Sequence, residues 1–473
     1  MIENCSSYPP LVSSGFNNQQ ASLARRKQHQ EAPTVGMKYA IELFEKIWFP
    51  GAVVVSDMER NGIMLDIPRC KQKAEEATSR LFELEKELHI RSGVLINWHS
   101  PKQVSEYLYG IRGFKVPPIG GNLKATKLNK EGKPTTSEAA IDWLARNYEA
   151  GKGLFDALLS FKCSSKLLSF YGSLPGYALP DSFVHPQLSA STDTGRLSCR
   201  NPNLQQQPPE TRELFIAPPG QCLVVVDFAG LEWRILAHIV AKRYGDFSLV
   251  DDVKAGIDPH SKTAKQVFSL TADVQQIKKL HPIERDKAKT LVYSINYGKT
   301  PAGLAAQLRI SLQEAQGMLD GFYEANPGVS RWHEDCVALA LAGGARTLLG
   351  RWRDIPELKS RASFARGRRL AMNTPIQGSA ADIVTVARLR CNPEPHPELV
   401  RLGWFNERLH RLGAKLLLEV HDELIVECPE KNGPQVLAEM KSTLANCMVG
   451  VRDFLCPLEA SGGYGPNWAL AKG

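Results

Sequence analysis

Residues 285–298 read RDKAKTLVYSINYG, a stretch in which Arg285, Lys289, Tyr293 and Tyr297 recur at every fourth position. Side chains at positions i and i+4 of an α-helix lie on one face. The spacing therefore predicts a helix that presents two cations and two phenols along about 18 Å, at about 1.5 Å per residue. Such a face fits a triphosphate at one end and a sugar and base at the other. The alternative is an ordinary helix with a solvated charge pair and two core-facing tyrosines, since such repeats are common.

Two aspartates elsewhere favour the first interpretation. CLVVVDFAG at 222–230 predicts a buried strand that ends at Asp227, and AKLLLEVHDELIVECP at 414–429 predicts a tight hairpin with Asp422 at its tip. Either aspartate alone is an ordinary turn or cap residue. A carboxylate at the end of an apolar strand nevertheless needs a partner, and Mg²⁺ prefers such oxygen ligands. Together with the basic helix, the aspartates indicate two-metal phosphoryl transfer from a triphosphate to a hydroxyl. The absence of a GxxxxGK[ST] segment disfavours P-loop chemistry.

Composition sets broader limits. The chain has 473 residues, 43% of them hydrophobic, and a net charge of +8, which is weakly in favour of a polyanion-binding protein. Its ten cysteines form no CxxC spacing and are expected to be reduced thiols. No apolar stretch is long enough for a membrane span, so a cytoplasmic protein without membrane partners is expected. The polar segment 1–39 is predicted to be disordered; because it is poor in acidic residues, an organellar transit peptide is the alternative.

Several further segments occur in a fixed order with these motifs. They are TDTGRLSCRNPNLQQQP at 192–208, DFAGLEWRILAH at 227–238, LLGRWRDIP at 348–356, MNTPIQGSAAD at 372–382 and VHDELIVE at 420–427. With RDKAKTLVYSINYG, this set resembles the family A DNA polymerases, in their Klenow-type polymerase region, from about residue 40 to residue 468. The resemblance implies template-directed DNA synthesis from a primer by a nucleotidyltransferase of DNA replication or repair.

The resemblance also implies an α+β fold with the shape of a right hand. Residues 40–190 would form a helical thumb, 191–250 and 371–473 a palm with an antiparallel sheet, and 251–370 helical fingers. Finger closure would bring the 285–298 helix onto the nucleotide.

Site residues follow from the resemblance, position by position. Asp227 and Asp422 would be the catalytic pair that binds two Mg²⁺ ions, with Glu423 in a supporting role. Lys289 would also donate a proton to the leaving pyrophosphate, and Glu232 would block a ribose 2′-hydroxyl. The residues implied to contact the nucleotide are Arg285, Lys289, His260, Glu232, Tyr293, Tyr297 and Gly298. Those implied to lie along the DNA are Arg196, Gln377, His421, Asn373 and Arg369, of which Asn373 could instead cap a helix and Arg369 be a surface cation.

The sequence departs from the family pattern in three places, one of which spans several residues. The first motif usually reads DYSQIELR, whereas Phe228, Ala229, Gly230 and Trp233 stand within it here. Glu419 stands where many relatives carry Gln, and Tyr293 stands where relatives that reject dideoxynucleotides carry Phe. The tyrosine predicts that this chain accepts dideoxynucleotides well.

Proofreading is not expected in this chain. Only residues 1–39 precede the matched region, and Asp57 and Glu59, although they have the DxE form of an exonuclease motif, are interpreted as structural. The expected partners are primer–template DNA and dNTPs; separate exonuclease, helicase or clamp proteins are further candidates.

Two other functions remain as alternatives. A single-subunit RNA polymerase shares the basic helix and both aspartates, but Glu232 argues against it. A catalytically inactive DNA-binding scaffold would not need the two aspartates together with Arg285 and Lys289.

Overall fold

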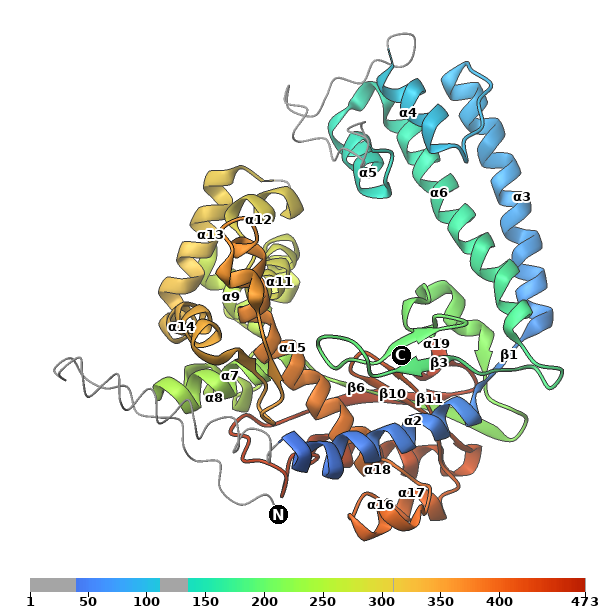
Figure 1. Ribbon diagram of the computed structural model, residues 1–473. Coiled ribbons are helices and arrows are strands. Elements are labelled where there is room, and N and C mark those ends of the chain that lie inside the picture. Colours follow the sequence, from blue (N-terminus) through green and yellow to red (C-terminus); the bar gives the residue numbers. More distant parts are fainter. Residues whose placement is uncertain (1–39, 111–134, 309, 473) are drawn as a thin grey trace. The chain divides into compact units, whose positions relative to one another are not determined.

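The computed structural model describes residues 40–110, 135–308 and 310–472, and the segment 1–39 with its predicted disorder lies outside them (Figure 1). The chain divides into two compact units. The small unit contains Ile63–His185 and Gln206–Ile216, and the large unit contains the rest. Residues 40–62 therefore pack with the large unit. The names palm, fingers and thumb stay predictions.

The small unit is built around two long helices. α3 (Ile67–Ser92) and α6 (Lys152–Ser173) run side by side, and α4 (Pro101–Tyr109) and α5 (Glu138–Asn147) lie at one end of the pair (Figure 1). Asp66 starts α3, because its side chain accepts a hydrogen bond from the backbone N–H of Arg69. Leucines and aromatic residues of these helices, among them Leu88 and Phe161, form a buried core. At the other end, β1 (Ile63–Leu65) pairs with β2 (Phe183–Val184) and β5 (Phe215–Ile216).

The large unit contains a four-stranded antiparallel sheet. Its strand order is β11 (Ala460–Gly465), β6 (Gln221–Phe228), β10 (Glu423–Pro429) and β9 (Lys415–Val420). Positions 222–226 of β6 are all buried, which agrees with its uninterrupted apolar sequence. α18 (Gly433–Ala445) and α19 (Trp468–Lys472) pack against β6 and β11, and α2 (Phe49–Asn61) packs against β9. The predicted α+β class is confirmed.

One long helix connects this sheet region to the helical part of the large unit. α15 (Phe364–Arg390) is buried almost continuously from Ala371 to Leu389. It packs against α2 and α18, and also against α7 (Leu231–Tyr244), which follows β6, and α14 (Pro327–Gly343). A helix buried on all sides can fix the positions of several neighbours at once.

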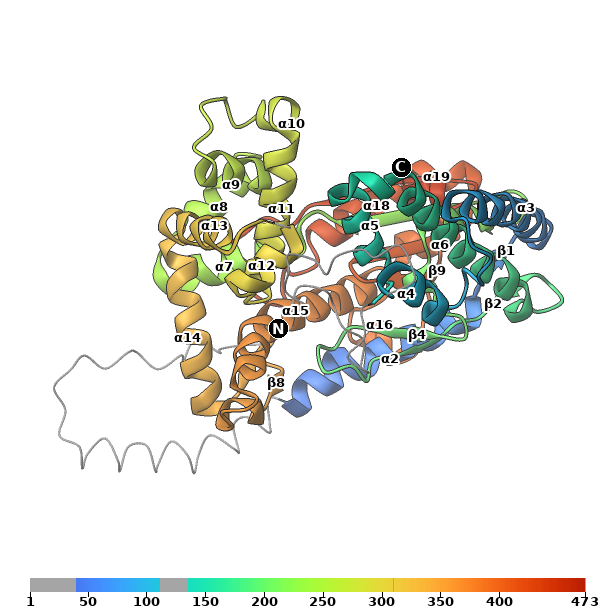
Figure 2. The ribbon, with the colours of Figure 1, turned by 90° about the horizontal axis from the view of Figure 1, so that it is seen from above.

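Residues 248–343 are mostly helical, and they cover most of the range 251–370 that was expected to be helical. The segment comprises α8 (Ser248–Lys254), α9 (Pro259–Val267), α10 (Ile277–Leu280), α11 (Pro282–Asn296), α12 (Pro301–Leu308), α13 (Leu312–Ala325) and α14. Figure 2 shows α9 and α11 side by side. Ala264 of α9, Ile277 of α10 and Ala288 of α11 form a buried cluster. A two-stranded hairpin, β7 (Ala345–Arg346) and β8 (Trp352–Arg353), follows α14.

The DxE carboxylates near the start of the described chain both have structural partners. Asp57 is 3% exposed and pairs with Arg60 and with His396 Nε2, each at 2.6 Å. Glu59 accepts a hydrogen bond from the backbone N–H of Leu188 at 2.6 Å. These contacts agree with the structural interpretation of the motif. None of the helices in the described part of the chain is long and apolar enough to cross a bilayer.

Candidate active site

Asp227 and Asp422 lie together at one end of the sheet. Asp227 is directly opposite Glu423 in the β6–β10 register, and the backbone N–H of Phe228 donates to the Asp422 carbonyl oxygen at 3.2 Å. Burial, followed by the negative charge of Asp422, raises the pKa of Asp227 to about 6. Asp227 Oδ1 is buried and has no hydrogen-bond partner among the described residues. Such a carboxylate pair fits a bound cation, which would offset the charge and occupy the free oxygen.

The hairpin turn that carries Asp422 is strained. β9 ends at Val420 and β10 begins at Glu423, so His421 and Asp422 form a two-residue turn. His421 has a φ of 62°, which a residue with a side chain seldom adopts. It is exposed at the tip. Strain of this kind persists where the surrounding structure fixes it, frequently at functional sites.

Glu423 is held by two C-terminal residues that the sequence interpretation did not identify. Its side chain is 1% exposed; Oε1 accepts from Trp468 Nε1 at 2.7 Å, and Oε2 pairs with Lys472 Nζ. Lys472 also lies 3.7 Å from Asp227 Oδ2. Both carboxylate oxygens of Glu423 are thus bonded to other side chains of the protein, which agrees with a supporting role. Asn467-Trp468 was recognised in the sequence only as the end of the resemblance, and local spacing gave no signal for Lys472.

In the α11 stripe, formed by Arg285, Lys289, Tyr293 and Tyr297, three residues are exposed and Arg285 is partly buried. Tyr293 is 48% exposed, Tyr297 is 37% exposed, and Lys289 is also exposed. The opposite face, formed by Ala288, Leu291, Val292 and Ile295, is buried. The alternative of two core-facing tyrosines is therefore wrong.

Tyr293 lies within the electrostatic field of the carboxylates. Burial raises its pKa, and the charges of Asp422, Glu232 and Asp227 raise it further. The α11 stripe and the aspartate pair, which are far apart in the sequence, therefore act on the same region.

The first cation of the stripe is held by the start of α9. Asp258 caps α9 by accepting from the backbone N–H of Ser261 at 2.9 Å, and it also accepts from Arg285 Nε at 2.8 Å. Although burial opposes the shift, the hydrogen bonds from Arg285 and Ser261 lower the pKa of Asp258. This contact fixes the guanidinium and leaves it further N–H donors. The Asp-Pro-His-Ser sequence at 258–261 carried the cap signal that could have revealed this role.

His260 lies between this cap and the stripe. Its ring centroid is 5.7 Å from that of Tyr293. Burial lowers its pKa, and the positive charges of Arg285 and Lys289 act in the same direction against the opposing charge of Asp258. His260 Nδ1 is buried without a hydrogen-bond partner among the residues described. The three predicted triphosphate contacts are therefore neighbours.

A second polar stripe runs along α15 and meets the first. This stripe consists of Arg369, Asn373 and Gln377, which are spaced four residues apart. Arg369 is exposed, Asn373 is partly buried, and Gln377 is 9% exposed. Asn373 Nδ2 donates to Gln377 Oε1 at 2.8 Å, and Gln377 Nε2 donates to Tyr297 Oη at 2.7 Å. The end of α11 is thereby joined to the middle of α15. Asn373 and Arg369 both lie within the helix, so the helix-cap alternative for Asn373 is wrong.

Gly298 allows α11 to end against α15. Its φ is 57°, and a Cβ at this position would lie 2.4 Å from Met372 Sδ. Both the backbone conformation and the close contact require glycine here.

Arg196 and Glu232 form an ion pair beside the aspartates. Arg196 Nη2 donates to Glu232 Oε1 at 2.7 Å. Burial raises the pKa of Glu232, and the charge of Arg196 opposes that shift. Arg196 also acts on the pKa values of His421 and Asp422. It is therefore a central positive charge of the site.

The loop that carries Arg196 is anchored by the β7–β8 hairpin. Arg351 Nη2 donates to the carbonyl oxygens of Thr194 at 2.5 Å and of Gly378 at 3.0 Å, while its Nε pairs with the buried Asp382 at 3.0 Å. Arg353 pairs with Asp193 at 2.6 Å. The sequence interpretation recognised LLGRWRDIP as a segment but did not assign Arg351 a function.

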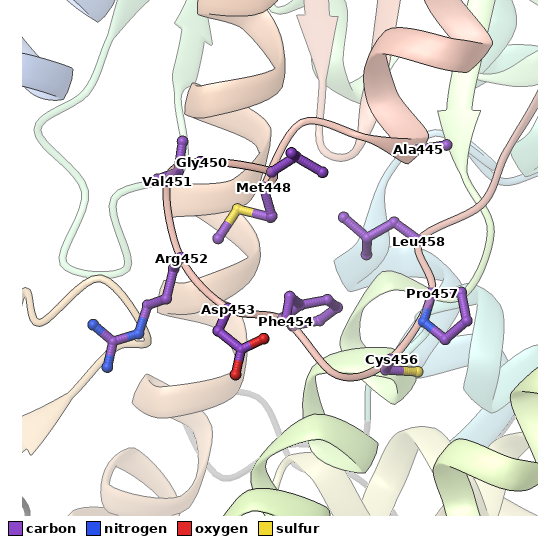
Figure 3. Close-up of a pocket in the computed structure, with 11 residues that line it drawn as sticks. Ala445, Met448, Gly450, Val451, Arg452, Asp453, Phe454, Cys456, Pro457 and Leu458 are labelled. Atoms are coloured by element: carbon purple, nitrogen blue, oxygen red, sulfur yellow. The ribbon is translucent and has the colours of Figure 1, made fainter. Parts of the chain in front are cut away.

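The structure offers no complete metal-binding cluster in its described residues: no group of three or more His, Cys, Asp or Glu side chains is arranged to hold an ion. A pocket of about 550 Å³ lies elsewhere, lined by Ala445 and residues 448–454 and 456–458 (Figure 3). None of the predicted site residues lines this pocket. The candidate active site is therefore defined by Asp227, Asp422 and the side chains around them, and not by this pocket.

The chain is similar in sequence to known proteins. The model of the family described as "DNA polymerase family A" matches residues 67–470. A thermostable DNA polymerase I of Thermus thermophilus is 31% identical over 449 residues, covering 92% of this chain and 49% of that protein. DNA polymerase I of Bacillus subtilis is 33% identical over 447 residues, covering 91% and 46%. The chain thus spans about half the length of these curated relatives.

A solved structure is similar over most of the chain. It is the POL domain of Pol1 from M. smegmatis in complex with DNA primer-template and dNTP. The TM-score is 0.78 at 28% sequence identity, and the match covers 91% of this chain and 71% of that one.

Proposed function

The chain belongs to DNA polymerase family A, and on that premise we propose that it extends the 3′ end of a primer with dNTPs on a DNA template. The observation that carries the proposal is the paired Asp227 and Asp422 beside the exposed α11 stripe, whose Tyr293 is influenced by both carboxylates. The reaction is a nucleotidyl transfer in which pyrophosphate leaves. A right-hand arrangement, with the sheet region as palm and the 248–343 helices within the fingers, belongs to the same proposal.

Members of the family generally depend on metal ions. Asp227 and Asp422 are the residues that would hold them, and we assign two Mg²⁺ ions because magnesium takes carboxylate oxygens and substrate phosphates together. When bound, the ions would stabilise the negative charge that develops on the attacking and leaving oxygens. The unpartnered Oδ1 of Asp227 supports this assignment. Glu423 would support the site from beneath, because Trp468 and Lys472 hold it in place.

The remaining residues would bind and orient the substrates. Arg285, Lys289 and His260 would contact the triphosphate, and Lys289, which is exposed, would protonate the leaving pyrophosphate. Tyr297 and Gly298 would pack over the new base pair. Along the DNA, minor-groove contacts are expected from Arg196, Gln377 and His421, with Asn373 and Arg369 further along the template. Because minor-groove acceptors are similar for all base pairs, such contacts depend on the geometry of the base pair rather than on the DNA sequence.

Primer extension with dNTPs and rNTPs on one primed DNA template tests the proposal. We expect extension by dNTPs in the presence of Mg²⁺, and strong discrimination against rNTPs because Glu232 would oppose a 2′-hydroxyl. Equal use of rNTPs would favour the single-subunit RNA polymerase alternative. DNA binding without extension by either nucleotide would favour the inactive scaffold.

Tyr293→Phe is expected to make the enzyme reject dideoxynucleotides. The pKa of Tyr293 is raised by burial and by the charges of the carboxylates, and its hydroxyl would replace the hydrogen bond that a missing 3′-hydroxyl would have formed. One such hydrogen bond is worth about 1 kcal/mol, so the preference for dNTP over ddNTP should rise by about fivefold or more. Termination frequencies at matched ddNTP:dNTP ratios measure this change. Equal termination by the wild type and Tyr293→Phe would contradict the assignment.

A further inference from the structure

A buried ion pair lies beneath the hairpin that carries Asp422. Arg388, on α15, is 1% exposed, and Glu419, on β9, is 4% exposed. Arg388 Nη1 donates to Glu419 Oε2. Fully buried pairs of this kind add little net stability compared with apolar residues, but loss of one partner leaves an uncompensated charge. Net stability therefore does not explain why this pair is present.

Its position connects it to the candidate active site. Glu419 lies two residues before His421 in the same strand and turn. The backbone carbonyl of Glu419 accepts a hydrogen bond from Gln205 Nε2 at 3.1 Å. Gln205 belongs to the segment 192–208 that also carries Arg196. Glu419 is thus attached both to the catalytic hairpin and to the segment of the central arginine.

Arg196 has one carboxylate partner, and a second carboxylate is subject to its charge. Arg196 is bonded to Glu232 at 2.7 Å, whereas Glu419 is bonded to Arg388. Burial raises the pKa of Glu419, and the positive charges of Arg388 and then Arg196 act against that shift. Arg196 is therefore within electrostatic reach of Glu419 without being its partner. Positive and negative charges therefore alternate along the series Arg388, Glu419, Arg196 and Glu232.

We propose that Arg388 is a positioning residue that neutralises Glu419 and so keeps Arg196 bonded to Glu232. This inference rests on the proposed function, because Glu232 is the residue expected to exclude a ribose 2′-hydroxyl. Without the charge of Arg388, Glu419 draws Arg196 toward itself and Glu232 loses the bond that orients it. Sugar selection would then depend on Arg388, a buried residue of α15.

Two matched substitutions test this role, because each neutralises one partner of the same pair with an amide. Arg388→Gln removes the cation that pairs with Glu419, whereas Glu419→Gln removes the carboxylate that would attract Arg196. We expect Arg388→Gln to lower the ratio of kcat/KM for dNTP over rNTP by about tenfold, the size of one charge-assisted hydrogen bond. Glu419→Gln should keep the wild-type ratio. Thermal unfolding should show that both variants fold and both lose stability.

Rescue experiments complete the test. Arg388→Lys should keep the wild-type ratio of kcat/KM for dNTP over rNTP, because it keeps the cation. The double variant Arg388→Gln/Glu419→Gln should restore that ratio, because it removes the carboxylate as well. Arg390→Gln is the control in the same helix, because Arg390 bonds to the carbonyl oxygens of Cys447 and Val449; it should leave the ratio unchanged. A wild-type ratio in Arg388→Gln, or an equal fall in both single variants, would overturn the inference. If the wild type itself fails to extend a primer, the proposed function fails instead.

Discussion

Asp422→Ala is expected to reduce primer extension by about 10³-fold or more, since metal ions supply several kcal/mol of transition-state stabilisation and each 1.4 kcal/mol is a factor of ten. Asp422 lies at the tip of a two-residue turn directly beside Asp227. Its removal takes away one of the two carboxylates that would hold the ions. The fold should persist, because the β9–β10 ladder pairs Val420 with Glu423 and includes neither residue of the turn.

Binding of primer–template should survive this substitution. The expected DNA contacts are cations and polar groups, so the logarithm of the affinity should fall with the logarithm of salt concentration along the same slope as in the wild type. Single-turnover extension and fluorescence anisotropy measure the two properties separately.

Glu427→Ala is the matched control. Glu427 lies at the opposite end of β10 and pairs with Lys415 at 3.8 Å. The Glu427→Ala variant should retain primer extension. Comparable losses in the two variants would show that the hairpin, rather than the Asp422 carboxylate, had been disturbed.

Arg351→Met is expected to destabilise the large unit by about 3–5 kcal/mol, the usual result of removing one partner of a buried ion pair. Asp382 is completely buried and would lose its cation. The same substitution removes the two hydrogen bonds that Arg351 donates to the carbonyl oxygens of Thr194 and Gly378. Denaturant unfolding should show the lower free energy, and primer extension should fall because the loop that carries Arg196 loses its anchor.

Arg353→Met provides the comparison. Arg353 pairs with Asp193 on the same loop, but the Asp193 side chain is 77% exposed. Exposed pairs contribute about 0–1 kcal/mol, so this variant should unfold nearly as the wild type does. Arg351→Met combined with Asp382→Leu should recover much of the stability, since no unpaired charge then remains. A large loss in Arg353→Met, or none in Arg351→Met, would contradict the assigned roles.

Local patterns predicted much of the site. The spacing of Arg285, Lys289, Tyr293 and Tyr297 predicted a single helical face because the α-helix repeats every 3.6 residues. The apolar runs before Asp227 and around Asp422 predicted a strand end and a hairpin tip. Each prediction depends only on neighbours within a few residues.

The partners of those residues were not predictable in the same way. Each of these residues has a partner that is distant in sequence. Arg285 pairs with Asp258, Arg351 with Thr194, Glu423 with Trp468 and Lys472, and Glu419 with Arg388. The departure at Glu419 was visible in the sequence, but its cation was not, because Arg388 follows MNTPIQGSAAD as one arginine among several.

The sequence by itself determined the helix, the strand and the hairpin, and through its ordered motifs the family. It left open whether the tyrosines of the α11 stripe faced the core or solvent, since periodicity defines a face without saying what covers it. Tertiary packing decided this, because α9 and its neighbours cover Ala288 and leave Tyr293 exposed. The charge partners were decided there as well, because buried groups find their counter-charges in space rather than along the chain.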